Sequence, residues 1–544
     1  MTPVFPPPRR IQYPGGTRAS VEPHIRLDTN LAAQNYRLVV DESGITLAAA
    51  DDAGIAYALD TLRQLTFDGS VPYVLVEDGP DIEVRGIMLD ISRDKVPTME
   101  TLEGLVDRMS AWRMNLLMLY IEHTYAYAGF DEVWQGWSPL TAEEVRDLDR
   151  MCTSRGVELV IQQNCLGHME KWLCHERFAP LAAIPGGWRD DRGHSELPTT
   201  LDPRLPESRD LVRELLRQQA VLRPSAARIH VGLDEPFDLN PQIWERIYAP
   251  EQYSDSDVGE VFTVPLGVEA QTLWTEWLAW LKALPELSGR EVLAWADVVS
   301  ANPETASAIP DGVTLVEWGY ESYHPFDERC AALADAGLPF WVCCGTSGWS
   351  SLAGRPTNAR LNIDASARAA VSHGGRGIVV ADWGDRGHVQ QLVVAEPAFA
   401  WAAARGWRHD ADLDWEDVAT RYAFRDGNGD LGRIVTAMGD AYRSLRPQVP
   451  EVSVLLTVLA EPGEFSRLRD AGLTDADLAE VSELLSDLQG RVRQCAPDRS
   501  DSAMVVAEVV HTLDWLQFAT RIGRYRLAVL AGQDSDGEIG RAHV

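Results

Sequence analysis

Short apolar runs alternate with helix-patterned segments through the middle of this chain. The runs are bounded by polar or turn residues and rich in aliphatic and aromatic side chains, as expected of buried parallel strands. The segments between them carry helix start signals, such as the capping box that Thr141 and Glu144 would form. Eight strand and helix units in series predict a (β/α)8 barrel rather than an open doubly wound sheet. The runs are VRGIMLD (84–90), NLLMLYI (115–121), VELVIQQ (157–163), ARIHVGL (227–233), EVLAWA (291–296), VTLVEW (313–318), PFWVCC (339–344) and GIVVADW (377–383).

The two ends of the chain follow other patterns. Near the start, YRLVV and ITLAAA stand on either side of the turn DESG, which predicts a β-hairpin, and a helical repeat follows from Ile55 to Leu65. Toward the other end the strand signals stop and only helix-patterned segments remain, such as 502–531. We therefore expect an α/β protein with a small α/β domain (1–80), a catalytic barrel (81–405) and an α-helical domain (406–544).

Charge and cysteine usage narrow the classes of partner. The chain has 82 Asp and Glu against 49 Lys and Arg, a formal net charge of −33. A surface of this sign repels phosphate backbones and anionic lipids, so neither nucleic acid nor a membrane is expected as a partner. The seven cysteines form no C-x-x-C pair, and no leader-like apolar segment is seen. These features predict a soluble, cytoplasmic protein with reduced thiols, no metal and no cofactor.

In a (β/α)8 barrel the reactive side chains lie just past the C-terminal ends of the strands. At those positions this chain carries mainly carboxylates and tryptophans. Carboxylates can protonate a glycosidic oxygen, and indole faces stack on the C–H face of a pyranose, so the combination indicates a carbohydrate site. In strand order the candidates are Arg85, Asp90 and Arg93; Glu122 and His123; Asn164 and His168; Asp234 and Glu235; Trp295 and Asp297; Glu317, Trp318 and Tyr320; Trp349; and Trp383, Asp385 and His388.

The fourth run ends in HVGLDEP (230–236), with two consecutive acids after a buried strand. Here the chain resembles the family-20 glycoside hydrolases, the β-N-acetylhexosaminidases, whose fourth barrel strand ends in a His-x-Gly-x-Asp-Glu motif. The resemblance covers most of the chain. It includes the small domain before the barrel, RGIMLDISRDKVPTMETL on the first strand and its helix, LGHMEKW after the third strand, and DWGD after the eighth.

The resemblance implies an exo-acting, retaining hydrolase for terminal β-linked N-acetylhexosamine. The 2-acetamido oxygen of the substrate would attack the anomeric carbon and give an oxazolinium intermediate. Glu235 would be the general acid and then the base, and Asp234 would orient the acetamido group. The remaining implied roles are support of the acid by Glu122 and His168, hydroxyl contacts from Arg85 and Asp385, and a pocket wall made by Trp295, Trp318 and Trp383.

Consecutive residues of an ideal strand point to opposite faces. Asp234 and Glu235 can therefore reach one sugar only if the backbone leaves strand geometry between Gly232 and Pro236.

The chain also departs from the family pattern. Members usually carry an acetyl-binding tyrosine after the seventh strand, and GTSGWSSLAGRPTNARLNID has none. Trp349, Asn358, Asn362 or the neighbouring Tyr320 would have to replace it. His123 and His388 are additions near the O4 side of the sugar, which favours N-acetylgalactosamine over N-acetylglucosamine.

Three alternatives remain open from the sequence. The chain could be a glycosidase for sugars that lack the acetamido group, with Glu317 as a second catalytic carboxylate. It could be a sugar-binding protein that has lost catalysis. The amphipathic C-terminal helices could make it an interaction protein, although domain packing or a homodimer surface explains them more simply.

Overall fold

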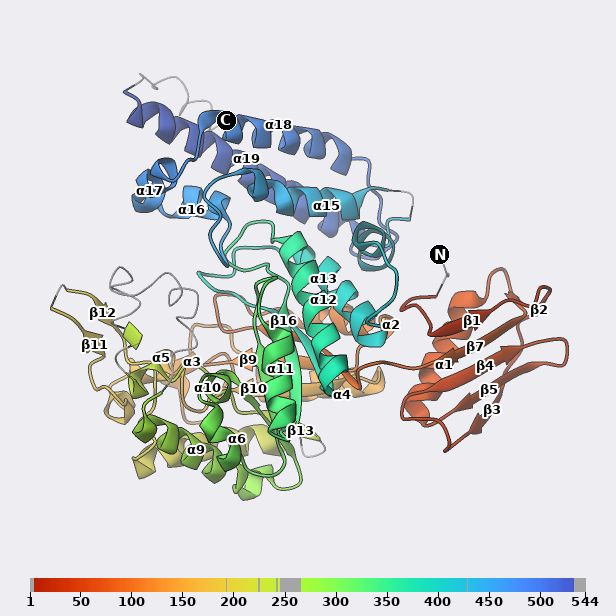
Figure 1. Ribbon diagram of the computed structural model, residues 1–544, viewed down its shortest axis with the longest axis horizontal. Helices are drawn as coiled ribbons and strands as arrows, with labels where there is room; N and C mark the ends of the chain where they lie inside the picture. Colours follow the sequence, from red (N-terminus) through yellow and green to blue (C-terminus); the bar gives the residue numbers. More distant parts are fainter. Residues whose placement is uncertain are drawn as a thin grey trace.

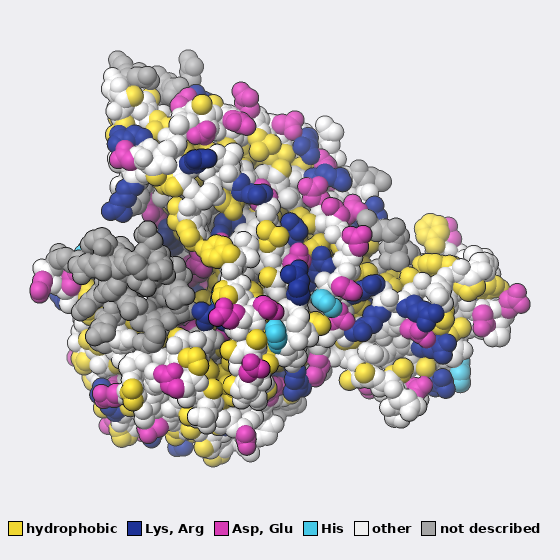
Figure 2. Space-filling view, in the orientation of Figure 1, with side chains coloured by type: hydrophobic (Ala, Val, Ile, Leu, Met, Phe, Trp, Pro, Cys, Tyr) yellow, Lys and Arg dark blue, Asp and Glu magenta, His cyan; other side chains and the backbone are white. Residues whose placement is uncertain are grey.

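The computed structural model describes residues 4–191, 193–223, 226–240, 243–244, 266–427 and 429–532. Three bodies are seen: a small sheet domain, a central barrel and a group of helices that packs on the barrel (Figure 1). None of the described helices is both long enough and apolar enough to cross a membrane. On the face drawn in Figure 2, acidic and basic side chains are interspersed.

The N-terminal domain is a five-stranded sheet with the order β1-β7-β4-β5-β3 and one helix. The predicted hairpin is present, because β4 and β5 pair antiparallel with Val40 opposite Ile45. The predicted helix follows it, and the Asp51 side chain caps this helix by accepting from the Gly54 amide. The elements are β1 (Arg10–Gln12), β2 (Thr17–Ala19), β3 (His24–Leu27), β4 (Tyr36–Val40), β5 (Ile45–Ala49), α1 (Asp52–Leu65), β6 (Ser70–Pro72) and β7 (Val74–Asp78).

The eight apolar runs form the eight parallel strands of a closed barrel, which confirms the predicted fold. Their order around the barrel is β8-β9-β10-β13-β14-β15-β16-β17, and β17 closes on β8. The strands are almost wholly buried on both faces, which explains why they read as continuous apolar runs. They are β8 (Val84–Asp90), β9 (Leu116–Ile121), β10 (Glu158–Gln163), β13 (Arg228–His230), β14 (Glu291–Trp295), β15 (Val313–Trp318), β16 (Phe340–Gly345) and β17 (Gly377–Asp382).

Helices surround this barrel, and a short hairpin of β11 (Trp188–Arg189) and β12 (Ser195–Glu196) extends from it. The predicted capping box is present at α4, where Thr141 and Glu144 each accept a hydrogen bond from the other's backbone amide. The helices are α2 (Met99–Ala111), α3 (Asp131–Trp134), α4 (Ala142–Ser154), α5 (Glu170–Leu173), α6 (Pro206–Leu222), α9 (Val268–Lys282), α10 (Asp297–Ala301), α11 (Phe326–Asp335), α12 (Pro356–His373) and α13 (Glu396–Trp407).

After α13 the described chain is helical, as the sequence predicts. The two longest helices of this region, α18 and α19, pack on each other, and α19 also packs on α16. The predicted frayed tail, 533–544, lies outside the described residues. The helices are α14 (Trp415–Val418), α15 (Leu431–Asp440), α16 (Val454–Ala460), α17 (Phe465–Asp470), α18 (Asp475–Val492) and α19 (Ser502–Leu530), with a π-helical turn at Ala419–Ala423.

Side chains fill the inside of the barrel and form a core of their own. Met88, Met118 and Val160 lie in this core, and Trp295 and Trp383 belong to the same cluster. These two residues stand at or just past the C-terminal ends of their strands, so the inner core carries aromatic rings at the end of the barrel where a site is expected.

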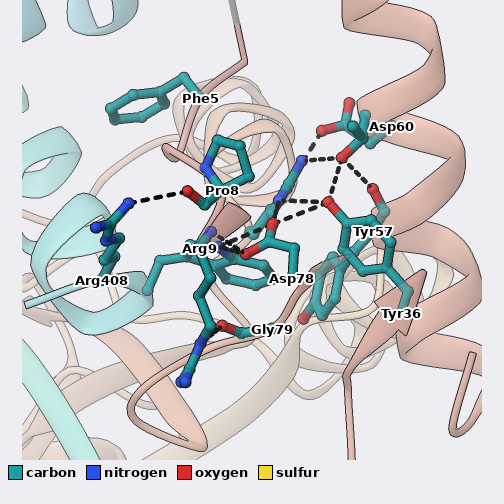
Figure 3. A network of polar contacts seen from close by, with 12 residues as sticks. Phe5, Pro8, Arg9, Tyr36, Tyr57, Asp60, Asp78, Gly79 and Arg408 are labelled. Atoms are coloured by element: carbon teal, nitrogen blue, oxygen red, sulfur yellow. Dashed lines mark hydrogen bonds and ion pairs between the residues drawn. The ribbon is translucent and has the colours of Figure 1, made fainter. Parts of the chain in front are cut away.

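A network of polar contacts around Asp78 and Tyr36 joins the N-terminal domain to the barrel (Figure 3). Arg113 Nη1 lies 3.1 Å from Asp78 Oδ2, and both side chains are fully buried. Tyr36 and Trp407 also donate hydrogen bonds to Asp78, and the Arg113 guanidinium stacks 4.7 Å from a Trp407 ring. Trp407 ends a helix of the barrel but packs in the core of the N-terminal domain. The two domains therefore share one core.

We expect Asp78→Asn to destabilise the protein by about 3–5 kcal/mol, because the change leaves the charge of Arg113 buried without its counterion. The matched control is Glu77→Gln, since Glu77 forms an exposed pair with Arg10 at 3.1 Å, and we expect at most about 1 kcal/mol there. Urea unfolding of both variants measures the difference. Equal losses of unfolding free energy in the two variants would show that the buried pair stabilises the protein no more than the exposed pair does.

Candidate active site

The backbone turns sharply where β13 ends. The strand stops at His230, and Gly232, Leu233 and Glu235 then adopt φ of +71°, +76° and +45°. Left-handed backbone is rare for residues with a side chain, and here two such residues follow a glycine. The departure from strand geometry that the sequence requires is present, and it lets the side chains of Asp234 and Glu235 line the same cavity.

Neighbouring elements hold this turn in place. Trp274 of α9 donates from Nε1 to the Leu233 carbonyl at 2.9 Å, and the Glu235 amide donates to Asp297 Oδ2 at 3.1 Å. Gly167 approaches from the loop after β10, where an added Cβ would lie 2.5 Å from the Asp234 carbonyl oxygen. The Asp297 pKa is raised well above its ordinary value by burial and by the nearby charges of Asp234 and Glu235.

His168 joins the two acids. Its Nε2 lies 3.2 Å from Asp234 Oδ2 and 3.3 Å from Glu235 Oε2. Burial favours the neutral ring, but the adjacent carboxylates outweigh it, and the pKa of His168 is well above its ordinary value. His168 itself has φ of +54°, so all three members of this group depend on left-handed backbone in their immediate neighbourhood.

The acids face a cavity of about 380 Å³ with an aromatic wall. Trp318 stacks on Tyr320, and Tyr320 meets Trp349 edge to face at 5.0 Å between ring centroids. Two polar groups at this wall have no hydrogen-bond partner among the described residues: Asp234 Oδ1 and the indole N–H group of Trp295. The predicted site residues that line the cavity are His168, Asp234, Glu235, Trp295, Trp318, Tyr320, Trp349, Trp383 and Asp385.

The prediction for Arg85 is wrong. Arg85 is the second residue of β8, so it lies at the opposite end of the barrel from the cavity. Its buried guanidinium donates to the carbonyls of Arg113, Ile82 and Glu83 and to the side chains of Gln34 and Tyr57, where it supports the N-terminal domain.

Arg93, and not Arg85, lies at the cavity. It follows the C-terminal end of β8 and lines the cavity. Its guanidinium pairs with Asp90 at 2.9 Å, approaches Asp385 at 3.6 Å and covers rings of Tyr120 and Trp383. The signal was available in the sequence, because Arg93 comes three residues after the last residue of the first run, on the reactive side.

Glu122 and His388 do not line the cavity, and their predicted roles at the site stay predictions. Glu122 accepts from Tyr120 at 2.8 Å and lies 3.5 Å from Arg93. Its pKa is raised, because burial outweighs the attraction of Arg93 and His168. His388 Nε2 lies 3.4 Å from the buried Asp382.

Other candidates prove to be structural. Asn358 donates to the Tyr320 carbonyl and to Ser347, and Asn362 donates to the carbonyls of Gly319 and Glu321. Neither replaces the acetyl-binding tyrosine, whereas Trp349 and Tyr320 line the cavity.

Glu317, the second carboxylate of the alternative mechanism, is buried. It accepts from Ser300 at 2.6 Å and lies 3.1 Å from His324. His123 is also fully buried, and burial lowers its pKa to about 4.

One group of the described residues could share a metal ion, and it lies away from the cavity. Asp81, His409 and Asp410 meet at the junction with the N-terminal domain. Asp81 already accepts hydrogen bonds from Arg9 at 2.5 Å and from His409 at 2.6 Å.

Comparison with known proteins agrees with this geometry. A family model described as "Glycosyl hydrolase family 20, domain 2" matches residues 8–79, and one described as "Glycosyl hydrolase family 20, catalytic domain" matches residues 83–345. A β-N-acetylhexosaminidase of Cellulomonas fimi is 23% identical over 446 residues, 76% of this chain and 83% of that protein. A β-hexosaminidase of Vibrio furnissii is 27% identical over 271 residues, which is 43% of either chain.

Among solved structures, a chitobiase of Flavobacterium johnsoniae has the same fold. It superposes with a TM-score of 0.60 over 97% of this chain and 93% of its own, at 16% identity. The two family models together match well over half of the sequence, and they meet at the boundary between the sheet domain and the barrel. The chain therefore belongs to glycosyl hydrolase family 20.

Proposed function

We propose that this protein is an exo-acting, retaining β-N-acetylhexosaminidase that uses the acetamido group of its substrate as the nucleophile. The observation that supports this most directly is the group formed by His168, Asp234 and Glu235 beside a tryptophan-walled cavity. The similarity to a β-N-acetylhexosaminidase of Cellulomonas fimi and a β-hexosaminidase of Vibrio furnissii supports the same class of reaction.

Asp234 is suited to hold the acetamido group. Its Oδ2 faces His168 while its Oδ1 has no partner among the described residues, so the second oxygen is free to accept the acetamido N–H. The positive charge that develops on the oxazolinium ring would then lie beside a carboxylate. The indole faces of Trp295, Trp318 and Trp383 would exclude water from the acetyl group.

Glu235 is suited to protonate the leaving oxygen. It reaches the cavity from the left-handed turn, and the Asp297 contact to its amide fixes its backbone. In the second step the same carboxylate would take a proton from the attacking water. His168 lies between the two acids and provides positive charge next to Asp234.

The preference between sugar epimers stays a prediction. The two histidines that favoured N-acetylgalactosamine, His123 and His388, do not line the cavity, so the proposal names the N-acetylhexosamine class. Arg93 and Asp385 line the cavity on the side of the first and eighth strands and are the groups that we expect to contact the ring hydroxyls.

The substrate class can be tested with four p-nitrophenyl β-glycosides. We expect turnover of the N-acetylgalactosaminide and the N-acetylglucosaminide, and none of the galactoside or the glucoside, because only the first two carry the internal nucleophile. The ratio of the first two gives the epimer preference. Comparable turnover of the plain glycosides would contradict the mechanism.

Glu235→Gln removes the proton donor and keeps its shape. We expect kcat/KM for a 4-methoxyphenyl glycoside to fall by about 10²–10⁴-fold. The fall should be far smaller for a 2,4-dinitrophenyl glycoside, whose leaving group needs no proton. Asp234→Asn is the comparison variant: it should slow both substrates alike, because it acts on the acetamido group. If Glu235→Gln also slowed the two substrates equally, Glu235 would not be the general acid.

The charge on His168 can be followed by NMR titration of its ring. We expect a pKa well above the usual value of about 6.5, and a lower pKa in Asp234→Asn, because the carboxylate stabilises the imidazolium. The exposed Asp327→Asn, on α11, is the control and should leave His168 unchanged. The charged His168 ring also stabilises the fold. This contribution is fully present below the pKa that the ring has in the unfolded chain, and it is lost as the pH rises through the pKa of the ring in the folded protein. An unchanged pKa in Asp234→Asn would show that the two groups are not coupled.

A further inference from the structure

The C-terminal helical region reaches into the cavity through one short segment, 449–453, which we call the strap. It precedes α16, and its residues Pro450, Glu451 and Val452 line the same cavity as Glu235. Figure 1 shows the helices of this region packed on the barrel. The strap therefore adds a wall to the site that none of the eight barrel strands provides.

Two barrel loops anchor the strap through its backbone. The Glu451 amide donates to Glu321 Oε1 at 2.8 Å, and the Ser453 amide donates to the Ser350 carbonyl at 3.0 Å. Glu321 is fixed in turn by the almost fully buried Arg355, whose Nη1 lies 2.6 Å from the same oxygen. The loops after β15 and β16 thus fix the position of the strap at the cavity.

The side chain of Glu451 takes no part in this anchoring. None of the described residues hydrogen-bonds or ion-pairs with its carboxylate, although the residue is half-buried and lines the cavity. Its φ is +59°, an unfavourable value for glutamate that is maintained without any contact from the side chain. An unpartnered polar side chain that lines a cavity from strained backbone is typical of a ligand-binding residue.

The surroundings of Glu451 also suit a hydroxyl group. Burial and the negative charges of Glu321, Asp385 and Glu235 together raise the pKa of Glu451 to about 7, although the nearby Arg355 opposes them. The side chain can therefore donate or accept a hydrogen bond near neutral pH, and a sugar hydroxyl can pair with it in either form.

We propose that Glu451 binds a ring or hydroxymethyl hydroxyl of the terminal sugar, so that the C-terminal helical region determines part of the substrate specificity. This inference rests on the proposed function. Glu451 would position the sugar and take no part in making or breaking bonds. Replacing it should therefore weaken substrate binding and leave the chemical step unchanged.

The test compares two substitutions that differ in reach. Asn tolerates the left-handed backbone better than Glu but is one methylene shorter, so Glu451→Asn should keep the strap and withdraw the polar group. We expect its KM to rise by about 5- to 10-fold, the loss of one hydrogen bond, with kcat nearly unchanged. Glu451→Gln restores the reach and should recover part of the loss. The control is Glu480→Asn, at an exposed position of α18.

Deoxygenated substrates identify the contact. With the 3-, 4- and 6-deoxy forms of the better p-nitrophenyl N-acetylhexosaminide, the penalty of Glu451→Asn should vanish for one of the three, because that substrate lacks the hydroxyl concerned. The same penalty for all three forms would overturn the proposal. So would a wild-type KM in Glu451→Asn, or a fall in kcat together with a fall in Tm, which would mark a structural role.

The two proposals fail in different ways. If the wild-type protein hydrolyses none of the acetamido glycosides, the proposed function fails, and tryptophan fluorescence titration with free N-acetylgalactosamine and N-acetylglucosamine then compares wild type with Glu451→Asn. If the wild type is active and the Glu451 variants match it, only the role of Glu451 fails.

Discussion

The site depends on one constraint, the left-handed turn that follows the fourth barrel strand. Without it, Asp234 and Glu235 would point to opposite faces, one toward the cavity and one into the helical layer. Left-handed backbone at residues with side chains costs about 1–3 kcal/mol each. The barrel offsets this with contacts that come from three other segments: Trp274, Asp297 and the loop containing Gly167. The proposed chemistry is thus built on strain that the surrounding fold maintains.

Electrostatics adds a second condition. Several carboxyl groups crowd one small cavity, and the described residues around it provide few positive charges, chiefly His168 between the two acids and Arg93 beside Asp385. Where such a partner is missing, burial and neighbouring negative charges raise the pKa of the carboxyl, as they do at Asp297 and Glu451.

The sequence was most informative where a local pattern decides the structure. Eight buried strands leave eight apolar runs, and the residues just after them identify most of the cavity. Arg85 was misplaced because it stands inside such a run but at the wrong end, and Arg93 was the residue to choose. Glu451 has no such signal: its place over the cavity results from the packing of distant helices and from backbone contacts to Glu321 and Ser350. Asn358 and Asn362 show the converse: they are polar residues near the site, and most of their partners are backbone groups, which no sequence pattern reveals.

The shared core around Arg113 and Asp78 limits how this protein can be divided. A barrel cut from its sheet domain would expose Trp407 and leave the buried guanidinium of Arg113 without Asp78, Tyr36 and Thr61. Arg85 would lose its hydrogen bonds to Gln34 and Tyr57 and keep those to backbone carbonyls of the barrel. The sheet domain and the barrel seen in Figure 1 are therefore not independent modules. Recombination at the first domain boundary would have to carry both sides of this interface together, whereas the strap could be exchanged without disturbing it.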